Sequence, residues 1–85
     1  MTVFAFAIGN EELWKKKDSL QCKKLIALLK LNNVVGSHQG FFDQLFLFET
    51  REQRDRALSQ VRQIGFDTAD ITIDSGEIDD AYRRN

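Results

Sequence analysis

The sequence contains one cysteine and one histidine among its 85 residues, and these scarcities limit the chemistry that it can carry. A single cysteine, Cys22, excludes an internal disulfide bond and fits the reducing conditions of the cytoplasm. His38 has no second histidine and no cysteine near it in the sequence, so nothing supplies the other members of a metal site or a catalytic triad. We therefore expect a cytoplasmic protein that is not an enzyme and that holds no metal and no cofactor.

Long hydrophobic runs are also missing, which argues against insertion into a membrane. The apolar stretch at residues 3–8 is too short to span a bilayer, and no basic residue precedes it. We interpret it as a first strand rather than as a signal peptide. Charged residues make up 29% of the chain and hydrophobic residues 42%, an ordinary composition for a soluble chain. The length predicts a single domain over residues 1–85 with one two-layer core.

The net charge of −1 conceals a separation of charge along the chain. All lysines lie between residues 15 and 30, whereas only acidic residues carry charge between residues 67 and 80. Four lysines are expected on the outer side of the first main helix: Lys16, Lys23, Lys24 and Lys30. They either keep that helix solvated or form an electrostatic docking surface for an acidic partner.

Hydrophobic periodicity predicts the elements of the first half of the chain. A strand at residues 3–8 is followed by a helical turn near residues 11–14 and a helix over residues 18–31. Asp18 and Gln21 have the spacing of a capping box at the start of that helix. Its inward stripe is expected to consist of Cys22, Leu25, Ile26 and Leu29.

The second half begins with a predicted hairpin. A short strand starting at residues 34–35 leads through a polar turn bounded by glycines into an aromatic strand, residues 41–49. The helix that follows, residues 51–64, is the most clearly marked element, because Thr50 and Gln53 form a capping box at its start.

The last elements complete a recognisable order of strands and helices. Gly65 is expected to end the second helix in the left-handed conformation, a strand follows at residues 69–74, and the tail from about residue 75 is polar. The order predicts an α+β fold of the ferredoxin-like βαββαβ type, a two-layer sandwich with both helices on one face of an antiparallel sheet. The residues expected to be buried are Leu25, Leu29, Leu58, Val61, Ile64 and Ile71.

Both central strands of this fold are apolar on both of their sides, although helices can cover only one side. An apolar patch should therefore remain outside. Either the phenylalanines form the core and a small aliphatic face is tolerated in water, or the patch is an interface with a second copy or another protein. We expect an interface, whose candidate residues are Phe4, Phe6, Phe46 and Phe48.

RNA binding is an alternative, because the RNA recognition motif has the same topology and stacks bases on aromatic residues of its central strands. Residues 3–6 and 40–49 resemble its two signature strands. However, no basic residue directly precedes Gly40, and none follows it before Arg51. The sheet therefore supplies little charge to neutralise phosphates.

The C-terminal half contains stretches at residues 47–50, 57, 64–66, 71–74 and 78–82 in which apolar residues recur among polar ones. This spacing resembles that of short uncharacterised proteins of phages and mobile elements in Gram-positive bacteria. The resemblance implies a small accessory or regulatory protein, such as one that binds a host factor, and it carries no site residues across. We therefore expect a binding module that contacts a protein partner or forms a homodimer, with a nucleic-acid-binding domain and a structural subunit as the alternatives.

Overall fold

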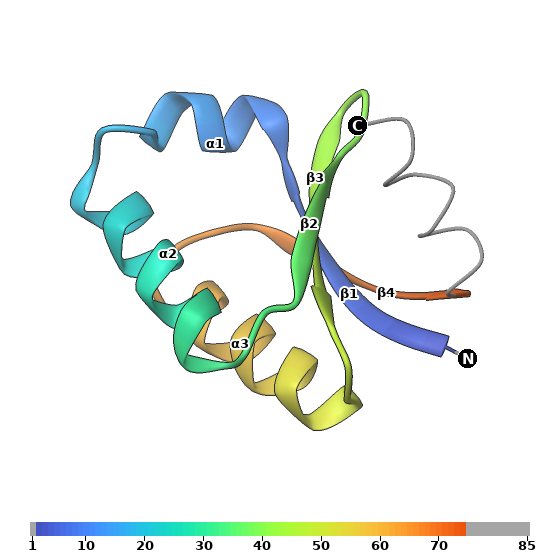
Figure 1. Cartoon of the computed structure of the whole chain (residues 1–85). Helices are drawn as coiled ribbons and strands as arrows, with labels where there is room; N and C mark the ends of the chain where they lie inside the picture. The colour runs from blue at the N-terminus through green and yellow to red at the C-terminus, as the bar shows by residue number, and fades with distance from the viewer. Residues whose placement is uncertain (1, 75–85) are drawn as a thin grey trace.

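A computed structural model describes residues 2–74 of the chain. These residues form one four-stranded sheet and three helices. The strands are β1 (Thr2–Gly9), β2 (Gly36–Gln39), β3 (Asp43–Phe48) and β4 (Thr68–Asp74), and the helices are α1 (Asn10–Lys16), α2 (Leu20–Leu31) and α3 (Arg51–Gln63). All three helices lie on one side of the sheet (Figure 1), so the described residues form two layers, as the α+β class predicts.

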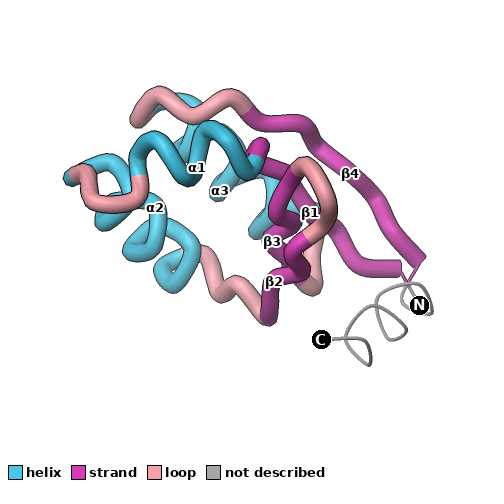
Figure 2. The backbone as a smooth tube through the Cα atoms, turned by 90° about the horizontal axis from the view of Figure 1, so that it is seen from above, coloured by secondary structure: helices cyan, strands magenta, loops and turns pink. Residues whose placement is uncertain are grey.

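The sheet has the strand order β2-β3-β1-β4, and every neighbouring pair of strands is antiparallel. The two central strands are therefore β1 and β3, and they pair with Phe6 opposite Phe46 and Phe4 opposite Phe48. A view from above shows the strands on one side and the helices on the other (Figure 2). This register decides which side chains meet the helices and which point away from them, because side chains alternate along each strand.

The core between the layers contains most of the side chains that periodicity assigned to it. Leu25, Leu29, Leu58 and Val61 are buried as predicted, whereas Ile64 and Ile71 are only partly buried. Ile26 was expected in the inward stripe of α2, but its side chain is exposed. The reason is that α2 packs mainly against α3 and not flat on the sheet, so a narrower strip of its surface is covered.

The first main helix starts later than the capping box predicted. The turn near residues 11–14 is a seven-residue helix, α1, and it extends to Lys16. The chain needs the following residues to change direction, so α2 begins at Leu20 and its N-cap is Ser19 instead of Asp18. The Ser19 hydroxyl accepts a hydrogen bond from the backbone N–H of Cys22 at 3.2 Å, which satisfies a free donor of the first turn.

The hairpin was predicted correctly, but its turn was placed wrongly. Strand β2 occupies Gly36–Gln39, the segment expected to be the turn, and β3 begins only at Asp43. Phe41 and Phe42, expected at the head of the aromatic strand, lie in the turn itself. The Gly40 N–H donates to the Asp43 carbonyl at 2.8 Å and closes this turn.

Both ends of α3 agree with the prediction. The Thr50 hydroxyl accepts from the backbone N–H of Gln53 at 3.2 Å. After the helix, Gly65 has a φ of 99°, a conformation that glycine adopts without the steric cost of a Cβ atom. Phe66 then folds back, because its N–H donates to the Val61 carbonyl at 3.3 Å and its ring is buried in the core.

Replacing Thr50 by alanine should lower the free energy of unfolding by about 1 kcal/mol, because the change removes the acceptor for one free N–H of α3. Urea unfolding followed by circular dichroism measures this difference. The control is Thr50→Ser, which keeps a hydroxyl and should retain most of the stability. Equal stability of the alanine and serine variants would show that the cap contributes nothing.

Candidate functional site

The phenylalanines proposed as an interface lie on the side of the sheet that faces the helices. Phe6 and Phe48 are completely buried and Phe46 is nearly so, and their rings are in contact, with centroids 5.3 Å and 5.7 Å from that of Phe6. These three residues belong to the core with α2 and α3 and are not available to a partner. Phe4 is partly buried under the guanidinium carbon of Arg51, 5.4 Å from its ring centroid.

The opposite face of the sheet is aliphatic. It carries the alternate residues of β1, β3 and β4, namely Val3, Ala5, Ala7, Leu45, Leu47, Ala69, Ile71 and Ile73. Ala5 and Leu47 form a separate buried cluster against which partly buried valine, leucine and isoleucine residues pack. The register places His38 of β2 opposite Leu45 on this face, so the described face carries one imidazole beside the aliphatic cluster and no phenylalanine of the core.

The four candidate lysines do not act as one surface. Lys16 bonds Glu12 at 2.9 Å and the Gly65 carbonyl at 2.8 Å, and its ammonium lies 4.6 Å from the ring centroid of Phe66. Lys16 therefore ties α1 to the segment after α3 and was wrongly expected to project outward. Lys23, Lys24 and Lys30 are exposed on α2, with no ion pair to any residue between 2 and 74.

The most exposed aromatic side chains of the described residues stand in the β2–β3 turn. Phe41 is 93% exposed and Phe42 is 85% exposed, and their ring centroids are 5.8 Å apart. Large apolar side chains are usually buried, so two adjacent phenylalanines in water form a distinct feature of this surface. We refer to Phe41 and Phe42 together as the aromatic tip.

Asn10, the first residue of α1, holds the aromatic tip in place. Its side-chain Nδ2 donates to the carbonyls of Gly40 at 3.1 Å and Phe41 at 3.3 Å, and its backbone N–H donates to the Phe42 carbonyl at 2.9 Å. Three hydrogen bonds from one residue therefore fix three successive carbonyls of the turn. Figure 1 shows the turn beside the junction of β1 and α1. The aromatic tip is thus a fixed projection and not a loose loop.

An apolar groove of about 250 Å³ opens near this turn, between α1, α2 and β3. It begins at Gln44, two residues after Phe42, and extends along Leu13 to Ile26. Trp14, the next residue of α1 after Leu13, is 70% exposed. The end of the molecule that carries the aromatic tip therefore presents further apolar surface on two helices.

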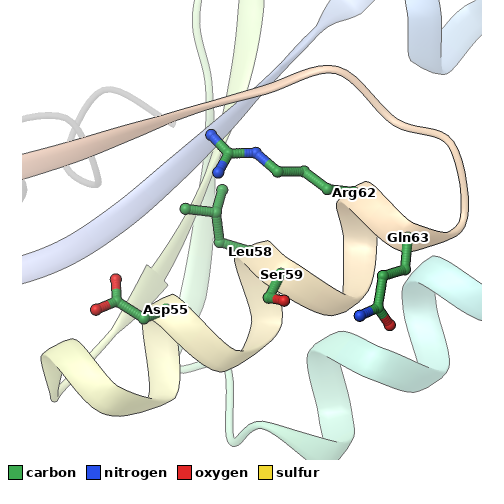
Figure 3. Close-up of a pocket in the computed structure, with 5 residues that line it drawn as sticks. All are labelled: Asp55, Leu58, Ser59, Arg62 and Gln63. Atoms are coloured by element: carbon green, nitrogen blue, oxygen red, sulfur yellow. The ribbon is translucent and has the colours of Figure 1, made fainter.

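A shallow depression along α3 is lined by Asp55, Leu58, Ser59, Arg62 and Gln63 (Figure 3). The Arg62 side chain reaches over Leu58 in Figure 3. Its Nε donates to the Thr68 hydroxyl at 2.8 Å. The depression contains one hydroxyl group and no histidine or cysteine that could activate it.

Residues 2–74 contain no group of three or more histidine, cysteine, aspartate or glutamate side chains placed to hold a metal ion. Within the same residues no helix has the length and the hydropathy needed to cross a bilayer.

Comparison with known proteins gives no family: no protein-family model matches the chain, and no curated protein matches it.

The aromatic tip was not predicted from the sequence, because both phenylalanines were expected inside a strand. The signal available was the pair of turn-forming residues that flank them, Gly40 and Asp43.

Proposed function

We propose that this protein is a non-enzymatic binding module that docks on another protein through the aromatic tip. The observation that carries the proposal is the exposure of Phe41 and Phe42 at 93% and 85% in a turn fixed by Asn10. A surface feature of this kind is unfavourable in water, and binding to a partner removes the cost.

The energetics favour a tight contact through few residues. Burying each phenylalanine against an apolar pocket contributes about 1.5–3 kcal/mol. Little of this is lost in ordering the turn, because the hydrogen bonds of Asn10 already hold it before binding. Paired aromatic anchors at the centre of a contact are typical of protein–protein interfaces.

A protein partner explains the surface better than a nucleic acid does. The side of the sheet opposite the helices is mainly aliphatic, and among the described residues the register places only the His38 ring there, which is less than the set of stacking rings on a base-binding sheet. Among the described lysines, three are exposed and have neither an ion pair nor an aromatic ring against the ammonium group: Lys23, Lys24 and Lys30. Three positive charges on one helix give at most a weak, salt-sensitive site for a nucleic-acid backbone.

We also propose that the fold is the ferredoxin-like one, with α1 as an addition before the first crossover helix. The strand order β2-β3-β1-β4 with antiparallel neighbours supports this assignment. The resemblance to phage and mobile-element proteins supports a role as an accessory protein that binds a host factor. The partner can equally be a second copy of this chain, since an apolar pocket on either would accept the aromatic tip.

The test compares the wild type with a Phe41→Ser, Phe42→Ser double variant. Proteins of the source cell that bind the immobilised wild type are identified, and the Kd of each purified pair is measured by calorimetry. The double variant should bind the partner about 100-fold more weakly, since about 3 kcal/mol of apolar burial is lost. Sedimentation of the wild type alone shows whether the partner is a second copy.

The matched control is a Leu20→Ser, Leu31→Ser double variant, because these leucines of α2 are also well exposed, at 67% and 70%. It should bind like the wild type. Equal loss in both variants would mean that binding is unspecific, and no loss in either would place the interface elsewhere. Binding to a labelled oligonucleotide that disappears in a Lys23→Glu, Lys24→Glu variant would favour the nucleic-acid alternative instead.

A further inference from the structure

The apolar groove between α1, α2 and β3 has the size and the chemistry of a receptor for an aromatic ring. Its volume is about 250 Å³, and the aliphatic part of its lining consists of Leu13, Leu25, Ile26 and Leu29. An apolar cavity of about 150 Å³ is enough to hold a benzene ring inside a protein. Leu25 and Leu29 are buried, whereas Ile26 is 53% exposed, so the groove is closed by the core on one side and open to water on the other.

The aromatic tip does not fill the groove of its own chain. The hydrogen bonds of Asn10 hold the turn in a conformation in which Phe41 and Phe42 remain 93% and 85% exposed. The tip and the groove nevertheless lie close together, because Gln44 lines the groove and follows Phe42 by two residues, which is about 7 Å along a strand. Figure 1 shows the β2–β3 turn and α1 at the same end of the molecule. One end of the chain therefore presents both an aromatic projection and an open apolar groove.

We propose that this groove receives the aromatic tip of a second copy of the chain, and that the second copy receives the tip of the first in the same way. The inference rests on the proposed function, because it names the partner of the aromatic tip. A surface that contains both parts is self-complementary, so a two-fold axis brings each tip to the groove of the other copy and closes the assembly as a dimer. Asp43 follows the tip and Lys17 lines the groove, so charges of opposite sign accompany the two parts.

The exposed aromatic area at this end agrees with what a stable dimer needs. Trp14, which follows the groove residue Leu13, is 70% exposed and adds a third aromatic side chain to the tip residues. An aromatic side chain buries about 150–250 Å², so three from each copy supply about 1,000 Å² before the walls of the groove are counted. Specific interfaces begin at about this size. A second copy makes every contact twice, which makes it a better occupant than a protein that offers only a groove.

Sedimentation equilibrium of the wild type and of two variants tests the proposal. Phe41→Ser with Phe42→Ser removes the tip, and Ile26→Glu places a charge in the groove at a position that is exposed enough to accept it. The wild type should dimerise at micromolar concentration, and each variant alone should dimerise more than about 100-fold more weakly. A mixture of the two variants should recover part of the association, because the tip of one still fits the groove of the other.

The matched control is Leu31→Glu, which adds the same charge to α2 at a residue that is 70% exposed and is not part of the groove lining. It should dimerise like the wild type. Circular dichroism confirms that each variant retains the fold before its association is compared.

Two side chains report on the groove in the unmodified protein. Trp14 is the only tryptophan of the chain, and Cys22, its only cysteine, lines the groove. As the protein concentration rises through the range of dimer formation, the emission of Trp14 should shift to shorter wavelength and the reaction of Cys22 with a thiol reagent should slow. The variant without the tip should show neither change. This measurement decides the proposal even if Ile26→Glu does not fold.

Three results would overturn the proposal: a wild type that stays monomeric at high concentration, a dimer that survives either variant, or a rate of Cys22 labelling that does not depend on concentration. They leave the proposed function to its own test, because a different protein that binds the wild type and not the variant without the tip would still dock on Phe41 and Phe42. Loss of the dimer in the variant without the tip alone would mean that the tip docks on the second copy outside the groove.

Discussion

Replacing Phe48 by alanine is expected to lower the free energy of unfolding by about 3–5 kcal/mol, which is the usual cost of deleting a buried ring. Phe48 is completely buried and lies against Phe6, with ring centroids 5.7 Å apart. The cavity left behind would adjoin α3, where Ala57 is too short to fill it and Val61 is already packed. A loss of this size is a large part of the stability of a small domain.

The matched control is Phe41→Ala, which removes the same ring from the same hairpin. Because Phe41 is 93% exposed, its loss should change the free energy of unfolding by less than about 0.5 kcal/mol. Urea unfolding of both variants, with Phe48→Leu as a milder change of about 1–2 kcal/mol, gives the comparison. If Phe41→Ala cost as much as Phe48→Ala, the assignment of the two rings to surface and core would be wrong.

The sequence could not decide which face of the sheet the phenylalanines occupy. In β1 and β3 both faces are apolar, so alternation alone gives no preference. In the structure the larger side chains occupy the face that packs against the helices, where the rings of Phe6, Phe46 and Phe48 fill the space between the two layers. The opposite face carries smaller side chains such as Ala5. The candidate interface was therefore assigned to the face that forms the core.

The helix caps show where local chemistry is sufficient and where it is not. Thr50 was identified correctly because one capping residue stands alone before α3. Before α2, Asp18 and Ser19 are both good capping residues, and only the length of α1 selects Ser19. The order of strands and helices was predictable from hydrophobic spacing, whereas such one-residue choices depend on how neighbouring elements end.

The aromatic tip was not predicted, because nothing local distinguishes a phenylalanine in a turn from one in a strand. Its exposure depends on a partner distant in sequence, Asn10, whose hydrogen bonds hold the Gly40 and Phe41 carbonyls in the turn. Contacts over thirty positions are set by the fold. Hydrophobic periodicity therefore predicts strands and helices well, but it does not predict hydrogen bonds between residues that are distant in the sequence.

Arg54 carries the second large effect that we expect. It lies three and four residues before Ala57 and Leu58, so it belongs to the inward side of α3, although arginine normally faces water. Its exposure is only 6%. Its Nη1 donates to the Ala5 and Ile71 carbonyls, each at 3.2 Å, and its Nε donates to Asp55 at 2.6 Å. Arg54 therefore joins α3 to the central strand β1 and the edge strand β4.

Replacing Arg54 by alanine should lower the free energy of unfolding by about 2–4 kcal/mol, because hydrogen bonds from a charged donor to two strands are lost together with buried packing. Arg54→Met retains much of the packing and should lose less, which separates the two contributions. Hydrogen exchange should show faster opening of β4 than of β3, since β4 loses a hydrogen bond to α3 and β3 does not.

Arg56 supplies the control for this variant, because it lies on the same helix and its side chain is exposed. Arg56→Ala removes the same charge and should change the free energy of unfolding by less than about 0.5 kcal/mol. Raising the salt concentration should leave the difference between the two variants almost unchanged, because a buried donor is screened far less than a surface charge. If both variants lost the same stability, or if salt removed the difference, Arg54 would act only through its charge at the surface and not as a link between α3 and the two strands.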